Sequence, residues 1–316
     1  MELKAKVREF IASGAISMNE LGRSLGYSNG SMISQWLGET AEKPFKGDRA
    51  KLASAVEAYV VNYERNHSSR TIKTQEWIET NDYKMAKYVV DQAVIEREMA
   101  LLCGDPGVGK TTAIKRIAAS LPQAIVIEAD ISMTAKALFR ALCLQLGVDT
   151  PPRNLYEMKE VVIDRLKKRD CVIFIDEGEH LPHRALEMLR RVWDFTKTPI
   201  VYCGTRILLN NITGASRGAE YAQLKRRIKG KWEFRSLVYE EMSDDDKPRK
   251  SDKELRKVCA VFGVESEKVI GAVYRVAGGN FGNVIDLLKN SAKLAALHDA
   301  PISAQIVEEA ARMLLI

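Results

Sequence analysis

A glycine-rich segment at residues 104–111, Gly-Asp-Pro-Gly-Val-Gly-Lys-Thr, carries residue types suited to phosphate chemistry. It fits the pattern G-x-x-x-x-G-K-S/T, follows an apolar run at residues 99–103 and precedes a helical pattern. Glycines let consecutive main-chain N–H groups turn toward phosphate oxygens, and the next helix adds the positive end of its dipole. The pattern predicts that Lys110 meets the β- and γ-phosphates and that Thr111 offers its hydroxyl to Mg²⁺. The alternative is a glycine-rich turn with a chance lysine.

The predicted cofactors are therefore ATP and Mg²⁺. The predicted nucleotide-binding residues are Gly104, Asp105, Pro106, Gly107, Val108, Gly109, Lys110, Thr111 and Thr112.

Two carboxylates end a second apolar run, at residues 171–175. In this arrangement a neighbouring strand brings an aspartate to Mg²⁺ and a glutamate to a water molecule. We expect Asp176 to hold the metal through water and Glu177 to polarise the attacking water as a general base. An acidic pair at a strand end can also be a solvated turn. Thr205, after the apolar run 199–204, is the candidate for sensing the γ-phosphate or positioning water; a plain strand-terminating turn is the alternative.

Five short apolar runs alternate with helical patterns between residues 99 and 237. Runs this apolar must be covered on both faces, so they predict an α/β fold with a parallel sheet between helices. The predicted strands are residues 99–103, 124–128, 171–176, 199–204 and 231–237. The predicted domains are a helix-turn-helix domain at 1–66, a linker at 67–75, an ATPase domain at 76–242 and a small all-helical lid at 243–316.

The N-terminal domain carries two short helical patterns joined by a tight turn, in which Gly26 can take the left-handed conformation and Ser28 can cap the second helix. Such a helix could enter a DNA major groove. The candidate base-contacting face is made of Asn29, Ser31, Ser34 and Gln35. Small helical bundles of this kind also serve as protein-interaction modules.

Composition narrows the class of protein. The net charge of +6 favours a polyanionic partner but does not decide it. No apolar segment is long enough to span a membrane, and the charged N-terminus does not read as a signal peptide, so we expect a cytoplasmic protein without a membrane partner. The five cysteines are widely spaced, which favours free buried thiols over a metal site.

The phosphate loop and the strands ending in Asp176–Glu177 and Thr205, with a helical domain after the sheet, resemble AAA+ ATPases over roughly residues 75–316. More narrowly, GDPGVGKT, IDEGEHL, CGTRILLNNITG and YAQLKRRI resemble the Mu B-type target-DNA activators of transposing phages. Those proteins also begin with a small helical DNA-binding domain, which extends the likeness to nearly the whole chain.

The resemblance implies an ATPase that assembles on double-stranded DNA as a filament or ring, binds it with little sequence preference and delivers it to a transposase. If a phage encodes the chain, its location is the host cytoplasm. Two alternatives stay open: another AAA+ DNA machine, such as a helicase loader or initiator, and an ATP-regulated helix-turn-helix repressor.

The resemblance also implies an arginine that completes the neighbouring subunit's site. The strip at residues 223–228 matches the stretch where it occurs, so Arg227 is the first candidate and Arg226 the second; a basic helical face is the alternative. The pattern departs from the family where glycine, at Gly282, stands in place of an expected lid arginine, whose role Arg275 could take.

Repeated along an assembly, a few positive charges in the ATPase domain could sum into DNA affinity. The candidates are Lys136, Arg140 and Arg217, which could instead be ordinary solvated surface.

Overall fold

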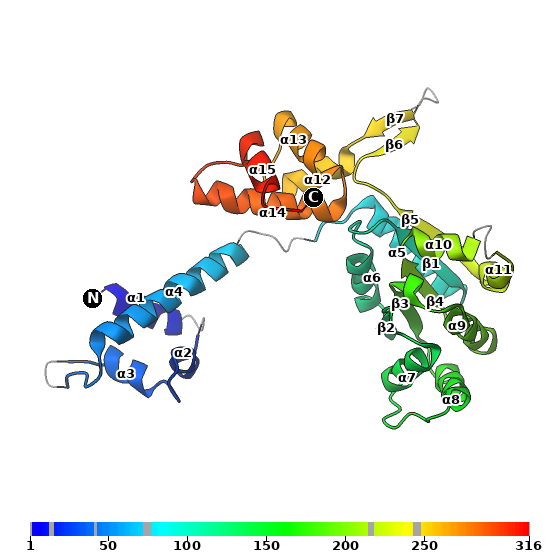
Figure 1. The fold of residues 1–316 in the computed structure, drawn as a ribbon, viewed down its shortest axis with the longest axis horizontal. Helices are drawn as coiled ribbons and strands as arrows, with labels where there is room; N and C mark the ends of the chain where they lie inside the picture. The colour runs from blue at the N-terminus through cyan, green and yellow to red at the C-terminus, as the bar shows by residue number, and fades with distance from the viewer. Residues whose placement is uncertain are drawn as a thin grey trace. The chain divides into compact units, whose positions relative to one another are not determined.

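The computed structural model describes residues 2–12, 16–40, 43–71, 77–213, 218–242 and 248–315 (Figure 1). The chain divides into two compact units, Met1–Gln75 and Glu76–Ile316, which are described separately.

The first unit is helical. Ile33, Trp36 and Val56 lie in its buried core. Its helices are α1 (Glu2–Ala12), α2 (Met18–Ser24), α3 (Ser31–Leu37) and α4 (Arg49–Thr71).

The turn between α2 and α3 differs in part from expectation. Gly26 adopts the predicted left-handed conformation, with φ of 85°. Ser28 does not cap the second helix: α3 begins three residues later, and the Asn29 side chain accepts the hydrogen bond from the Ser31 amide at 3.0 Å. α4 continues to Thr71, so residues 67–71 of the predicted linker are helical.

The second unit contains a five-stranded parallel sheet in the order β2-β3-β4-β1-β5. The five strands predicted from apolar runs are all present, but the fifth begins and ends three residues earlier than predicted. They are β1 (Met99–Gly104), β2 (Ala124–Glu128), β3 (Val172–Asp176), β4 (Ile200–Gly204) and β5 (Ile228–Phe234). The helices between them are α5 (Asn81–Ile95), α6 (Lys110–Ala119), α7 (Ala135–Gln145), α8 (Leu155–Lys167), α9 (His183–Thr196), α10 (Arg206–Thr213) and α11 (Gly218–Arg227), with a short 3₁₀ turn, η1 (Gly178–His180).

Alternate residues of each strand point to opposite faces of the sheet, and both faces are covered. On one face Leu101 and Ile173 pack in a core with α7, α8 and α9. On the other, Leu102 and Phe174 pack with α5 and α6. Burial on both faces explains why these strands read as continuous apolar runs.

Four helices, called the lid below, follow the sheet and bury Val258, Val273, Leu287 and Val307 in their own core. They are α12 (Lys253–Val261), α13 (Glu267–Ala277), α14 (Phe281–Leu297) and α15 (Ala304–Ala311). The expectation of helices alone after residue 243 is wrong at Pro248–Ser251, because this segment is strand β7, which pairs antiparallel with β6 (Tyr239–Met242). Short polar strands of this kind give a weak apolar pattern. No helix within the described ranges is both long and apolar enough for a membrane crossing.

Candidate nucleotide-binding site

The order of the strands brings the predicted segments to one edge of the sheet. β1 leads into the glycine-rich loop, β4 ends at Gly204 before Thr205, and β3 ends at Asp176. The sequence suggested that the strand ending in Asp176 neighbours the strand that precedes the phosphate loop. This is wrong, because β4 lies between β1 and β3. The carboxyl ends of parallel strands share one edge, so the three segments still meet.

The phosphate loop folds tightly around the Lys110 side chain. Gly109 has φ of 91° and precedes the first residue of α6. The Lys110 ammonium donates to the main-chain oxygens of Gly104 and Asp105, each at 2.9 Å, and the residue is only 6 % exposed. The loop's own carbonyls thus hold the lysine ammonium inside the loop.

A cavity of about 430 Å³ lies against this loop. Its wall includes most of the predicted site residues together with an unexpected carboxylate from the lid. Among the residues that form it are Lys110, Thr111, Thr112, Glu177, Thr205 and Asp286. The structure thus brings the phosphate loop, Glu177 and Thr205 after β4 to one cavity, whereas Asp176, the other acid of the pair, is not part of its wall.

Asp176 has a buried oxygen without a hydrogen-bond partner. The residue is 1 % exposed, its Oδ1 accepts a hydrogen bond from the Glu177 amide at 3.0 Å, and its Oδ2 is partnerless. A buried, unpaired carboxylate oxygen is costly, and Mg²⁺ is a hard cation that favours such oxygens. No group of three or more metal-ligating side chains occurs in the described part of the chain. Asp176 with the Thr111 hydroxyl therefore suits a Mg²⁺ ion that keeps water and phosphate ligands.

Glu177 has an unusual backbone and a perturbed acidity. Its φ of 51° lies in the left-handed region, which costs a non-glycine residue about 1 kcal/mol or more. Burial raises the pKa of the Glu177 carboxyl, and the nearby carboxylates of Glu179 and Asp176 raise it further. Strained backbone and perturbed pKa values both cluster at functional sites.

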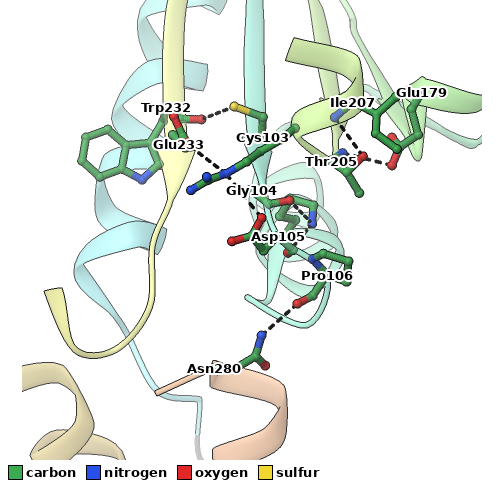
Figure 2. Close-up of polar contacts among 12 residues, drawn as sticks. Cys103, Gly104, Asp105, Pro106, Glu179, Thr205, Ile207, Trp232, Glu233 and Asn280 are labelled. Carbon is green, nitrogen blue, oxygen red and sulfur yellow. Dashed lines mark hydrogen bonds and ion pairs between the residues drawn. The ribbon is translucent and has the colours of Figure 1, made fainter. Parts of the chain in front are cut away.

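Glu179 is a residue that the sequence interpretation missed. Its Oε1 accepts a hydrogen bond from the Thr205 amide at 3.0 Å, as Figure 2 shows. Its Oε2 is buried without a partner and lies so close to Gly204 that a side chain there would overlap it. The carboxylate thus ties the turn after β3 to the end of β4. A glycine directly before Thr205 was the only sequence signal for this contact.

Arg206 adds a second link that was not predicted. Its guanidinium Nε lies 3.3 Å from Asp105 of the phosphate loop and 3.1 Å from Glu233 of β5. Figure 2 shows both carboxylates beside the loop. Since Arg206 directly follows Thr205, the β4 end and the phosphate loop are connected.

The lid meets the loop where the family's arginine was expected. The Gly282 amide donates to the Gly107 oxygen at 2.7 Å. Arg275, the suggested replacement, has a side chain that is 71 % exposed and pairs with Glu308 at 3.6 Å.

The two candidate trans-acting arginines differ in their surroundings. Arg227 Nε pairs with Asp194 Oδ1 at 3.0 Å, and Asp194 also pairs with the buried Arg190. Arg226 is exposed, and the structure records no ion pair for it within the described ranges. Both residues lie at the end of α11, immediately before β5.

The candidate DNA-contacting residues are mostly on the surface. Asn29, Ser31 and Gln35 are exposed at the start and along one side of α3. Lys136 and Arg140 are exposed one turn apart on α7. Arg217 lies outside the described residues.

Comparison with known proteins gives the class. Residues 95–212 match the family model described as "AAA domain". With the parallel sheet and the phosphate loop at the end of β1, this match shows that residues 95–212 have an AAA-type P-loop fold. A Walker-type ATPase of Pyrococcus abyssi shares the fold, with a TM-score of 0.50 and 12 % identity over 74 % of this chain and 71 % of that one.

More particular relatives match nearly the whole chain. The ATP-dependent target DNA activator B of Escherichia phage Mu is 23 % identical over 299 residues, which cover 94 % of this chain and 88 % of the relative. The Mu-like prophage FluMu DNA transposition protein B of Haemophilus influenzae is 24 % identical over 285 residues, covering 88 % and 93 %. The chain thus resembles the phage Mu B transposition protein.

Proposed function

We propose that this chain is an ATPase that assembles on double-stranded DNA with little sequence preference and delivers that DNA to a transposase in the cytoplasm, the host's if a phage encodes it. The names and the nearly full-length coverage of the relatives support the transposition role. The partnerless buried oxygen of Asp176, at the end of β3 on the sheet edge that also carries the phosphate loop, carries the proposal of a Mg²⁺-dependent ATP site.

The predicted site residues have distinct roles in this proposal. Lys110, in the wall of the cavity, contacts phosphate oxygens. Thr111 and Asp176 would hold Mg²⁺, which would neutralise developing phosphate charge. Glu177 accepts a proton from the attacking water, and the products are ADP and phosphate.

Thr205 and an arginine from a neighbouring subunit complete the proposed site. Thr205 lines the cavity and positions the water or the γ-phosphate. We propose that Arg227, or Arg226 beside it, reaches the nucleotide of the next subunit, where a guanidinium offsets charge in the transition state. The γ-phosphate then bridges two subunits, so the assembled state binds ATP more tightly than ADP, and hydrolysis shifts the population toward release.

DNA affinity in this proposal comes from many weak phosphate contacts. Lys136 and Arg140 are exposed, and an assembly repeats them along the duplex. The exposed residues of α3 offer a second, groove-facing contact.

The test measures ATP binding, ATP hydrolysis and assembly on duplex DNA by electron microscopy, with and without purified cognate transposase. The intact chain should bind ATP with Mg²⁺, hydrolyse it faster with DNA and transposase, and form continuous assemblies. Lys110→Ala should abolish binding and assembly, whereas Glu177→Gln should bind ATP and assemble while losing turnover by about 100-fold or more. Failure of the intact chain to bind ATP, with or without DNA, would refute the ATPase proposal. Discrete footprints on one DNA sequence would favour a repressor instead.

A further inference from the structure

The beginning of α14 is fastened directly to the backbone of the phosphate loop. Asn280, the residue before the helix, donates from Nδ2 to the Pro106 oxygen at 2.8 Å across 174 positions of the chain, as Figure 2 shows. Two residues on, the Gly282 amide donates to the Gly107 oxygen at 2.7 Å. We call this pair of contacts the lid clasp.

The clasp leaves little room for a side chain at either of its glycines. A Cβ on Gly282 would lie 3.0 Å from the Gly107 oxygen, and a Cβ on Gly107 would lie 2.7 Å from Asn280 Oδ1. Gly107 also has φ of 78°, which disfavours any side chain. The glycine that stands in place of an expected lid arginine is therefore what allows the helix to approach the loop.

The clasp also fixes the direction of the loop's donors. In a trans peptide, the carbonyl and the following N–H lie in one plane and point in opposite directions within it. Because the lid holds the Pro106 and Gly107 carbonyls, it turns the N–H groups of Gly107 and Val108 away from the lid contacts. These are two of the main-chain donors that a phosphate loop of this pattern directs at its ligand.

We propose that Asn280 and Gly282 are positioning residues for phosphate binding: the lid clasp orients the amides of Gly107 and Val108, and phosphate bound to those amides in turn holds the lid against the loop. This inference rests on the proposed function, since it presumes a nucleotide in the cavity. Coupling of two binding events is reciprocal, so whatever the clasp adds to nucleotide affinity, the nucleotide adds to lid docking.

Asn280 allows the two roles of its side chain to be separated. Its Oδ1 caps α14 by accepting from the Asn283 amide at 3.2 Å, while its Nδ2 forms the clasp. Asn280→Ser keeps a capping oxygen without adding charge but removes the donor that reaches Pro106. Ser303→Ala is the matched control, because Ser303 caps α15 in the same lid through the Ile306 amide at 3.3 Å.

The experiment titrates fluorescent ADP with Mg²⁺ into the full-length chain and each variant, and follows hydrogen exchange of α14. Asn280→Ser and Gly282→Ala should each weaken ADP binding by roughly fivefold, the equivalent of about one hydrogen bond. Ser303→Ala should stay within about twofold of the unaltered chain. ADP should slow exchange of the α14 amides in the unaltered chain and slow it much less in Asn280→Ser.

Two outcomes would overturn the proposed role of the clasp. In the first, the Asn280→Ser variant binds ADP as tightly as the unaltered chain. In the second, Ser303→Ala weakens ADP binding as much as Asn280→Ser does, since lid stability alone would then explain the loss. An unaltered chain that binds no nucleotide would instead overturn the proposed function itself.

Discussion

Replacement of Glu179 tests whether the turn after β3 positions the end of β4. Glu179→Ala removes the acceptor that holds the Thr205 amide at 3.0 Å. A hydrogen bond to a charged group contributes about 1.5 to 3 kcal/mol, so we expect the free energy of unfolding to fall by about 2 kcal/mol. For a unit the size of Glu76–Ile316, that corresponds to a fall in Tm of about 4 to 8 °C.

The same change should slow hydrolysis without weakening nucleotide binding. Thr205 lines the cavity, so loss of its anchor should raise the barrier by about 1.4 kcal/mol, or roughly tenfold in kcat. The Kd for ATP should stay within about twofold, because the phosphate loop keeps its own contacts. Glu179→Gln is the control, since its carbonyl oxygen can still accept from Thr205 and should restore most of kcat and Tm.

Calorimetry and single-turnover hydrolysis measure the two effects. If Glu179→Ala hydrolyses ATP at the unaltered rate and melts at the unaltered temperature, the reasoning is refuted. If Glu179→Gln is as impaired as Glu179→Ala, the negative charge matters rather than the hydrogen bond.

Three other predictions follow from burial and charge. Arg190→Leu should lower the free energy of unfolding by about 3 to 5 kcal/mol, because it leaves Asp194 without one of its partners in a nearly buried network. Urea titration measures this change, and an unchanged urea midpoint of unfolding would contradict it. Burial raises the pKa of Cys103 to about 11, so at pH 8 only about 0.1 % of this thiol is ionised. Native protein should therefore react slowly with a thiol reagent, whereas denatured protein should show all five thiols. Rapid labelling of Cys103 in the native protein would count against its burial. The double change Lys136→Ala and Arg140→Ala should make the slope of log binding constant against log salt concentration shallower by about 1.8. An unaltered slope would exclude phosphate contacts at these two residues.

The sheet could be predicted because burial on both faces leaves a strong trace in the sequence. Strands such as Val172–Asp176 are apolar at every inner position, and each is followed by polar residues where the chain leaves the core. The phosphate loop could be predicted equally well, since Lys110 and the glycines before it lie at fixed spacing after β1. These patterns depend on local sequence alone.

Contacts between distant segments left no such trace. That β4 lies between β1 and β3 depends on strand order, which apolar runs do not specify. Glu179 reads as one more acid in a polar turn until the fold brings it beneath Gly204. Asn280 and Gly282 looked like a departure from a family pattern, whereas the structure gives them contacts of their own with the loop.

The acceptors of the lid clasp are carbonyl oxygens, and every residue type has one. No substitution at Pro106 or Gly107 can delete them, so a mutational screen confined to the nucleotide motif would leave this connection intact or damage it only by distortion. A clean loss can be produced solely from the donor side, at a position 174 residues further along the chain. Variants of Asn280 would then weaken nucleotide binding although the residue lies outside the nucleotide motif, directly before a helix of the lid.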